Sequence, residues 1–522
     1  MSKIVIYDTT LRDGSQTEGV SYTVSDKVKI TEKLDELGVH YIEGGWPGSN
    51  PKDKEFFELM KLRKLKNAVL ASFGSTRRAN VKPGDDNNLK ELVASQTKTV
   101  TIFGKSWDLH VTDVIKTTLA ENLKMIGDSV AFLKSHRLEV FYDAEHFFDG
   151  YKHNPAYALK TVLAAQKAGA DGIILCDTNG GTLPEEVARI VKEVKKKVST
   201  PLGIHTHNDM DLAVANTLAG VNAGCVHVKG TFNGLGERCG NADLCTVIAI
   251  LHTKMKKTSI PENKIKHLME TSYYLSEVSN TTLSNNHAFV GHAAFAHKGG
   301  VHIDAILKNP MAYEHIEPSI VGNHRRLLTS ELAGKMPIIL KAQKMNITLD
   351  KNSEQTKKLL ADLQQYEHAG YQFEAADASF ELFMKRRLGR YQPFYHLDGF
   401  KVFTEKKPDG TVAAGATVRL KVNGHDEIAT VEGHGPVEVL DRALRGALKK
   451  FYPVLEDMHL SDYKVRVLDS KEGTGAKVRV LIESQDMKDS WTTVGVHENV
   501  IEASWEALAD SIEYKLLKDK KV

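Results

Sequence analysis

Residues 139–176 read EVFYDAEHFFDGYKHNPAYALKTVLAAQKAGADGIILC and contain two apolar runs separated by a longer helical pattern. The runs at 139–142 and 172–176 have the length and composition of buried strands. Between them, residues 154–168 follow a helical pattern that ends at Gly169, where glycine can adopt the left-handed conformation that terminates helices. This stretch predicts two parallel strands joined by a crossover helix.

The same alternation recurs through the first half of the chain. Short apolar runs, many of them β-branched, are each followed by a polar or glycine-rich turn and then a helical pattern such as 25–37. The runs lie at 4–7, 41–45, 68–73, 100–103, 139–142, 172–176, 202–205 and 226–231. Their spacing of roughly 25–40 residues is what one strand and one crossover helix require. We therefore predict an α/β protein that begins with a (β/α)8 TIM barrel at 1–265.

The remainder of the chain divides into two further parts. From 266 to 388, helical segments such as 267–278 and 350–368 alternate with polar stretches, which predicts a helical linker region. The last part, 389–522, contains a strand and a helix at 416–422 and 437–448.

A related pattern then returns within this last part. Strands at 476–483 and 491–496 and a helix at 500–508 follow the first set, and TVEGH at 430–434 echoes TVGVH at 493–497. We expect a C-terminal α+β domain with two pseudo-symmetric halves.

Length, charge and cysteine usage exclude several classes of protein. A chain of 522 residues is too long for one hydrophobic core. Its net charge of +2, from 69 basic and 67 acidic residues, provides no field that would attract nucleic acid or an anionic membrane. The sequence has no leader pattern and no apolar run that could span a bilayer, and its four cysteines lack CxxC spacing. We expect a cytoplasmic protein in a reducing compartment.

Two histidines lie at the end of the seventh predicted strand, in Ile204-His205-Thr206-His207-Asn208. Residues i and i+2 of a strand point to the same face, so both imidazoles can bind one metal ion. Barrel enzymes place their active sites at the carboxyl ends of the strands, where this pair lies. A lone HxH pair is more often a chance occurrence, so the assignment depends on further ligands.

Further ligands are available at two other strand ends. Asp13 follows the first strand and Asn241 follows the eighth, so closure of the barrel brings both toward the histidines. A carboxylate, an amide oxygen and two imidazoles can form an octahedral set with positions left for substrate. This donor set suits Mg²⁺ or Mn²⁺, with Zn²⁺ as the alternative. A metal with open positions can polarise the keto group of a 2-oxo acid, and Arg12 can stabilise the alkoxide that develops.

Two other patterns lie near this predicted site. Thr178 ends the sixth strand, where its hydroxyl can hold a substrate carboxylate. The glycines of 234–240 follow the eighth strand of a barrel series, whereas a dinucleotide-binding motif follows the first strand of a βαβ unit. We therefore give nucleotide binding little weight.

Three motifs carry a family resemblance: DTTLRDG at 8–14, HTHND at 205–209 and GLGERCGNA at 234–242. Together they resemble the family of metal-dependent barrel enzymes that contains the 2-isopropylmalate, homocitrate and citramalate synthases. The resemblance covers essentially the whole chain, because the two-part terminal domain is similar to the regulatory dimerisation domain of the family. It implies a metal-dependent Claisen-type condensation that joins the acetyl group of acetyl-CoA to a small 2-oxo acid, with the acyl group becoming alkyl on transfer.

The resemblance also implies roles for individual residues of the barrel. It implies metal ligation by Asp13, His205, His207 and Asn241, and substrate contacts from Arg12 and Thr178. Glu145 matches an acidic residue near the acetyl group. At Asp143 the chain departs from relatives that carry an aromatic residue, so the wall facing the acyl-CoA is expected to differ.

The base that removes a proton from the acetyl methyl group is expected to be His302, because this weak carbon acid needs a well-placed imidazole. GGVHID at 299–304 resembles a family segment whose histidine reaches the barrel of a neighbouring subunit, with Tyr313 beside it. Asp304 is expected to fix the tautomer of the imidazole. Outside such a motif, a histidine in a helical linker is more often structural.

Within the family, GGWPGSNP at 44–51 resembles the citramalate synthase branch, which uses pyruvate. The resemblance implies that acetyl-CoA, pyruvate and water give (R)-citramalate and CoA in isoleucine biosynthesis. It further implies a homodimer whose terminal repeat binds isoleucine as a feedback effector.

Several alternatives stay open at this point. With 2-oxoisovalerate as acceptor the enzyme would be a 2-isopropylmalate synthase, and with 2-oxoglutarate a homocitrate synthase. A lyase on a similar barrel would have no evident need for the two-part terminal domain. A non-catalytic sensor would not need Arg12 together with the four predicted metal ligands.

Overall fold

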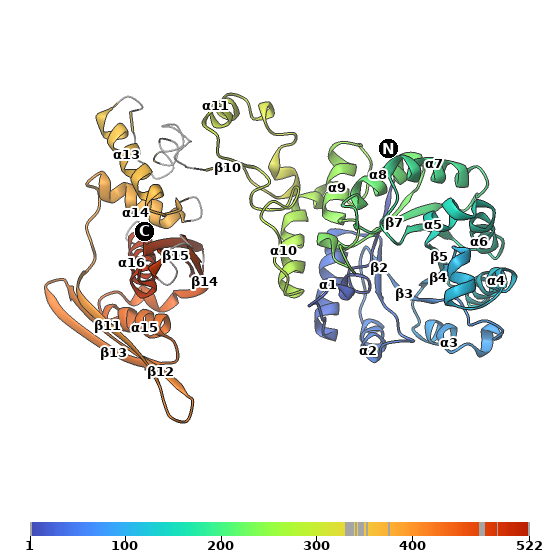
Figure 1. Ribbon diagram of the computed structural model, residues 1–522, viewed down its shortest axis with the longest axis horizontal. Coiled ribbons are helices and arrows are strands. Elements are labelled where there is room, and N and C mark those ends of the chain that lie inside the picture. Colours follow the sequence, from blue (N-terminus) through green and yellow to red (C-terminus); the bar gives the residue numbers. More distant parts are fainter. Residues whose placement is uncertain are drawn as a thin grey trace. The chain divides into compact units, whose positions relative to one another are not determined.

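The computed structural model describes residues 3–328, 339, 342, 349–350, 353–373, 376–468, 475–487 and 489–519. The chain forms two compact units (Figure 1). One unit comprises Met1–Phe295 with His315–Arg325, and the other comprises Ala296–Glu314 with Arg326–Val522. The predicted domain boundaries at residues 265 and 388 stay a prediction.

The first unit contains a closed barrel in which eight parallel strands follow one another in chain order. They are β1 (Val5–Asp8), β2 (Tyr41–Gly45), β3 (Val69–Ser75), β4 (Thr99–Lys105), β5 (Glu139–Glu145), β6 (Gly172–Asp177), β7 (Leu202–Thr206) and β8 (His227–Gly230). Pairing of β8 with β1, with His227 opposite Val5, closes the barrel. This closed barrel confirms the prediction. It could be predicted because strands that are buried on both faces appear in the sequence as continuous apolar runs.

One or two helices follow each strand of the barrel and pack against its outside. They are α1 (Val24–Leu37), α2 (Pro51–Met60), α3 (Asn87–Ala94), α4 (Leu119–Ser135), α5 (Phe147–His153), α6 (Pro155–Lys167), α7 (Pro184–Lys195), α8 (Ala213–Ala223), α9 (Leu244–Thr253) and α10 (Leu268–Val278). Local signals fix their ends: Thr23 and Asp26 form a capping box at the start of α1, and Gly38 ends α1 with a φ of 91°.

The apolar residues of the strands belong to two separate clusters. Ile6, Val140 and Ile173 belong to the large apolar cluster between strands and helices. Their neighbours Tyr7, Phe141 and Ile174 form a separate cluster with Ala71 and Cys176. Because adjacent strand residues point to opposite faces, this second cluster fills the interior of the barrel. The side chains at the carboxyl ends of the strands lie beyond this interior cluster, where they can line a site.

The second unit begins with short elements and helices. Strand β9 (Ala296–His297) pairs in parallel with β10 (Arg326–Leu327), and α11 (Gly300–Lys308) follows β9. Helices α13 (Glu354–His368) and α14 (Asp377–Arg387) come later in the chain. Of the helix predicted at 350–368, residues 351–352 lie outside the described residues.

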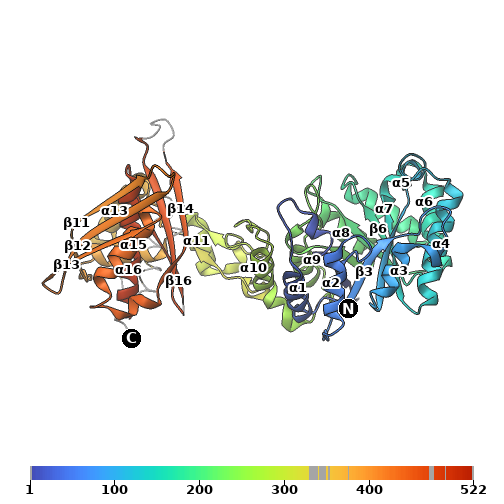
Figure 2. The ribbon, with the colours of Figure 1, turned by 90° about the horizontal axis from the view of Figure 1, so that it is seen from below.

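The C-terminal part of this unit contains two three-stranded antiparallel sheets, each followed by a helix (Figure 2). The first set is β11 (His396–Lys406), β12 (Val412–Val422), β13 (His425–Gly433) and α15 (Pro436–Leu448), and the second is β14 (His459–Val467), β15 (Val478–Gln485), β16 (Ser490–His497) and α16 (Val500–Asp519). The predicted pseudo-symmetric halves are confirmed, and the echoing motifs end β13 and β16. Within the described ranges, no helix is long and apolar enough to cross a bilayer.

Candidate active site and metal centre

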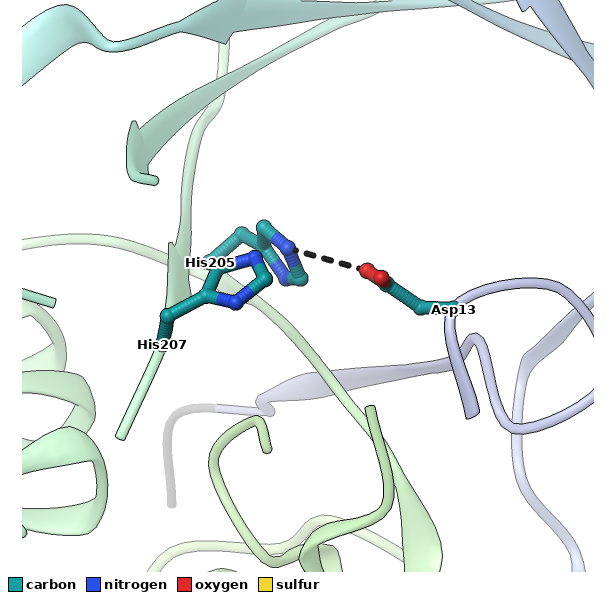
Figure 3. A group of neighbouring side chains, drawn as sticks. All are labelled: Asp13, His205 and His207. Atoms are coloured by element: carbon teal, nitrogen blue, oxygen red, sulfur yellow. Dashed lines mark ion pairs between the residues drawn. The ribbon is translucent and has the colours of Figure 1, made fainter. Parts of the chain in front are cut away.

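Asp13, His205 and His207 form a buried cluster at the carboxyl end of the barrel (Figure 3). His205 lies in β7, His207 follows that strand, and Asp13 lies in the turn after β1. Each side chain offers one ligand atom, and these atoms all lie within 4.8 Å of one another. The Asp13 Oδ2 atom lies 3.3 Å from His205 Nε2. The geometry therefore suits chelation of one metal ion.

The ring of His205 is oriented by the backbone of the neighbouring strand. Its Nδ1 atom lies 3.4 Å from the carbonyl oxygen of Lys229, which can only accept a hydrogen bond. This contact favours the tautomer with the proton on Nδ1 and leaves the Nε2 lone pair directed at the cluster.

Asn241 lies beside the cluster and has an unused oxygen. Its backbone pairs with that of His207, and its Nδ2 atom donates to the Leu235 carbonyl at 2.9 Å. Its Oδ1 atom and His207 Nδ1 are both buried and make no hydrogen bond within the described part of the chain. Orphaned buried polar atoms are costly, and a bound cation is one partner that would satisfy such an atom.

The electrostatics of the cluster favour the protonation states that metal binding requires. Burial would raise the pKa of Asp13, but the charge of Arg12, with a smaller contribution from His205, outweighs it and holds this pKa well below its usual value. Burial, with a smaller contribution from His205, lowers the pKa of His207 to about 3. An ionised carboxylate and a neutral imidazole are the forms that act as metal ligands.

Arg12 is held in a network of buried charges beneath the cluster. Its Nε atom donates to Glu43 Oε1 at 2.7 Å. Lys229 Nζ lies 2.7 Å from Glu43 Oε2 and 2.6 Å from Asp143 Oδ2. Burial would raise the pKa of Glu43, but the charges of Lys229 and Arg12 lower it to about 2. Positive and negative side chains alternate along this network, so each buried charge has an opposite charge beside it. The ion pair with Glu43 also holds the guanidinium of Arg12 in place.

Glu43 and Lys229 were missed by the sequence analysis. Each is a charged residue inside an apolar run, at 41–45 and 226–231, and both are fully buried. A charge within a buried strand needs a partner, so a charged residue inside an apolar run was the sequence signal that could have revealed the pair. Asp143 was noted from the sequence only as a position where relatives carry an aromatic residue. In the structure it is the second partner of Lys229.

A cavity of about 230 Å³ opens beside the cluster. Its lining combines the cluster with polar and aromatic side chains from the ends of other strands: Arg12, Gln16, Trp46, Phe73, Phe103, Asp143, Glu145, Cys176, Thr178, Glu237 and Arg238. Of these, the aromatic residues and Gln16, Glu237 and Arg238 were also missed. The predicted barrel residues Arg12, Glu145 and Thr178 are thus brought together around one space.

Thr178 and Glu145 have defined partners at this cavity. The backbone N–H of His146 donates to Thr178 Oγ1 at 2.9 Å, so the hydroxyl proton of Thr178 remains available for a ligand. Glu145 forms an ion pair with Lys105.

The predicted base and its neighbours lie in the second compact unit. The exposed ring of His302 stacks on that of Tyr313, with centroids 4.2 Å apart. Asp304 is exposed, and its Oδ2 atom accepts from Lys308 Nζ at 2.7 Å. The roles of these three residues stay predictions.

Comparison with known proteins places this geometry in a family. The protein named (R)-citramalate synthase in Geobacter sulfurreducens is 52% identical over 100% of this chain and 99% of its own. One of the same name in Aquifex aeolicus is 53% identical over 99% of this chain and 98% of its own. The chain belongs to the citramalate and 2-isopropylmalate synthase family. A 2-isopropylmalate synthase of Methanocaldococcus jannaschii is 30% identical over 99% of this chain and 96% of its own.

Three family models match this member of the citramalate and 2-isopropylmalate synthase family in succession. The HMGL-like model matches residues 3–273, and the homocitrate synthase post-HMGL domain-like model matches 289–370. The LeuA allosteric (dimerisation) domain model matches 374–516. The resemblance inferred from the three sequence motifs is confirmed.

Proposed function

We propose that this chain condenses acetyl-CoA with pyruvate and water to give (R)-citramalate and CoA, as a step of isoleucine biosynthesis. The observation that carries the proposal is the cluster of Asp13, His205 and His207 beside Arg12, in a chain similar over its whole length to proteins named (R)-citramalate synthase. The four cysteines are free, which supports a cytoplasmic location.

Asp13, His205, His207 and Asn241 would hold a divalent cation, Mg²⁺ or Mn²⁺ in preference to Zn²⁺. The cluster geometry, the orphaned atoms of His207 and Asn241, and the mixed oxygen and nitrogen donors support this assignment. When bound, such a cation supplies Lewis-acid polarisation of a keto group.

The chain's own residues would bind and orient the acceptor. Thr178 donates its free hydroxyl proton to the carboxylate of pyruvate. Arg12 lies beside the metal-binding carboxylate and stabilises the negative charge that develops on the keto oxygen. Because Glu43 holds Arg12 in place before the substrate arrives, little reorganisation is needed during the reaction.

Carbon–carbon bond formation requires a proton to leave the acetyl methyl group. We assign the removal of this proton to His302. Asp304 and Tyr313 orient its imidazole, and a neighbouring subunit of a homodimer contributes all three residues. The resulting enolate carbon attacks the keto carbon, and the alkoxide that forms on the keto oxygen takes up a proton and becomes the hydroxyl of the product. Water then cleaves the thioester and CoA leaves, with Glu145 near the acetyl group.

Release of CoA tests this activity directly. The purified chain is expected to release thiol from acetyl-CoA with pyruvate faster than with 2-oxobutyrate, 2-oxoisovalerate or 2-oxoglutarate. Chelation should abolish release, and Mg²⁺ or Mn²⁺ should restore it, because the cation polarises the acceptor. A preference for 2-oxoisovalerate or 2-oxoglutarate would reassign the acceptor, and no release with any acid would refute the proposal.

We further propose that isoleucine binds the C-terminal repeat of a homodimer and lowers activity. The match to the LeuA allosteric (dimerisation) domain over 374–516 supports both statements. Isoleucine added to the full-length chain is expected to slow CoA release, whereas alanine at the same concentration should not. Equal rates with and without isoleucine would contradict this regulation.

A further inference from the structure

We propose that Trp46 determines which acceptor this enzyme accepts. With Phe73 and Phe103 it forms an aromatic wall that fits the methyl group of pyruvate and excludes longer 2-oxo acid side chains. The inference rests on the proposed function and assigns its specificity.

The aromatic wall consists of three rings that hold one another. Phe73 on β3 and Phe103 on β4 stack with centroids 5.5 Å apart. The Trp46 ring system lies nearly perpendicular to both, with ring centroids 5.9 Å from Phe73 and 5.7 Å from Phe103 and interplanar angles of 84° and 81°. All three side chains line the cavity beside the metal cluster. Each ring contacts the other two.

Hydrogen bonds fix Trp46 at its two N–H groups. Its indole Nε1 donates to Asn88 Oδ1 at 2.8 Å, and Asn88 Nδ2 in turn donates to the Ser75 carbonyl at 2.6 Å. Its backbone N–H donates to Asp53 Oδ2 at 2.8 Å. The buried Asp53 is itself paired with the buried Lys27.

Two glycines leave room for the side chains of Asp53 and Asn88 that bind Trp46. Gly45 has a φ of +143°, and a Cβ there would lie 2.3 Å from Asp53 Oδ2. A Cβ at Gly74 would lie 2.7 Å from Asn88 Oδ1. Any larger residue at either position would push away a group that anchors Trp46. The backbone is therefore shaped around the position of this side chain.

The aromatic wall lies on the side of the cavity that the acceptor's third substituent must face. The groups proposed for its keto oxygen and carboxylate come from the ends of β1, β6 and β7, whereas the wall comes from β2, β3 and β4 on the other side of the barrel. The guanidinium carbon of Arg12 lies 3.9 Å from the Phe73 ring centroid. A ketone held at Arg12 therefore directs its side chain at the wall.

The test compares acceptor profiles of the wild-type enzyme and Trp46→Ala. For the variant, kcat/KM for 2-oxobutyrate relative to pyruvate is expected to rise by about 10-fold or more, the discrimination that one methylene carries. The KM for acetyl-CoA should stay unchanged. An unchanged ratio, or an altered KM for acetyl-CoA with the acceptor profile intact, would overturn the proposal.

Two further variants keep the test decisive. Asn88→Leu removes the indole's acceptor without removing the ring, and should shift the ratio in the same direction by a smaller factor even if Trp46→Ala fails to fold. Trp107→Phe changes a tryptophan of the same barrel that is absent from the described lining of the cavity, and should leave the ratio unchanged. Wild-type turnover of pyruvate is measured alongside, so failure of the proposed function is seen separately.

Discussion

Replacing Lys229 with methionine is expected to lower the free energy of unfolding by about 3–5 kcal/mol. Lys229 is fully buried, and its Nζ atom lies 2.7 Å from Glu43 and 2.6 Å from Asp143. Methionine fills a similar volume, but it leaves the buried carboxylate of Asp143 without a positive partner and leaves Glu43 with Arg12 alone. The midpoint of urea unfolding, followed by circular dichroism, measures the loss.

Two controls separate this effect from a general response to losing a lysine. Lys196→Met makes the same change at an exposed lysine that lies 2.8 Å from Glu193, and should change stability by less than about 0.5 kcal/mol. Combining Lys229→Met with Asp143→Asn should recover most of the loss, since the uncompensated charge is gone and Glu43 keeps Arg12 as its partner. Equal stability of Lys229→Met and Lys196→Met would contradict the role given to the buried network.

The His302→Ala variant is expected to turn over about 10²–10⁴-fold more slowly than the wild type, the range that general base catalysis contributes. The imidazole is exposed, so its removal costs little packing. The melting temperature and the affinities for metal and pyruvate should therefore stay close to wild-type values. Steady-state CoA release and calorimetric titration measure the two sets of quantities.

His434→Ala is the matched control, because it removes another exposed imidazole from the second unit. It should leave turnover unchanged. Wild-type turnover in His302→Ala would remove this residue from the mechanism, and equal losses of turnover and metal affinity would assign it a structural role instead.

The barrel could be predicted from sequence because its strands carry their signal locally. All eight apolar runs correspond to strands, and the ends of α1 and α6 follow from Gly38, Pro155 and the capping residues. In the C-terminal part, β12, β15 and β16 were found, but β11, β13 and β14 were not. The missed strands are largely exposed, so their sequences are polar and lack the apolar runs of buried strands.

The candidate site could be predicted only where its residues belong to short motifs. Asp13, His205 and His207 each follow or end a strand, and the barrel topology places those ends together. The network of Glu43 and Lys229 joins positions 186 residues apart, and the contact of Trp46 with Asn88 joins positions 42 residues apart. Residue spacing carries no signal for such contacts, since they depend on side-chain packing across the closed barrel.

Pairing of β1 with β8 determines when the barrel can close during synthesis of the chain. Val5 finds its partner His227 only after more than two hundred further residues have been synthesised. Asp13 follows the first of these strands and Asn241 the last, so the ligands stay apart on a nascent chain until the final strand docks. Loop closure over such a distance is slow, and a ribosome-bound fragment that lacks β8 cannot assemble the centre.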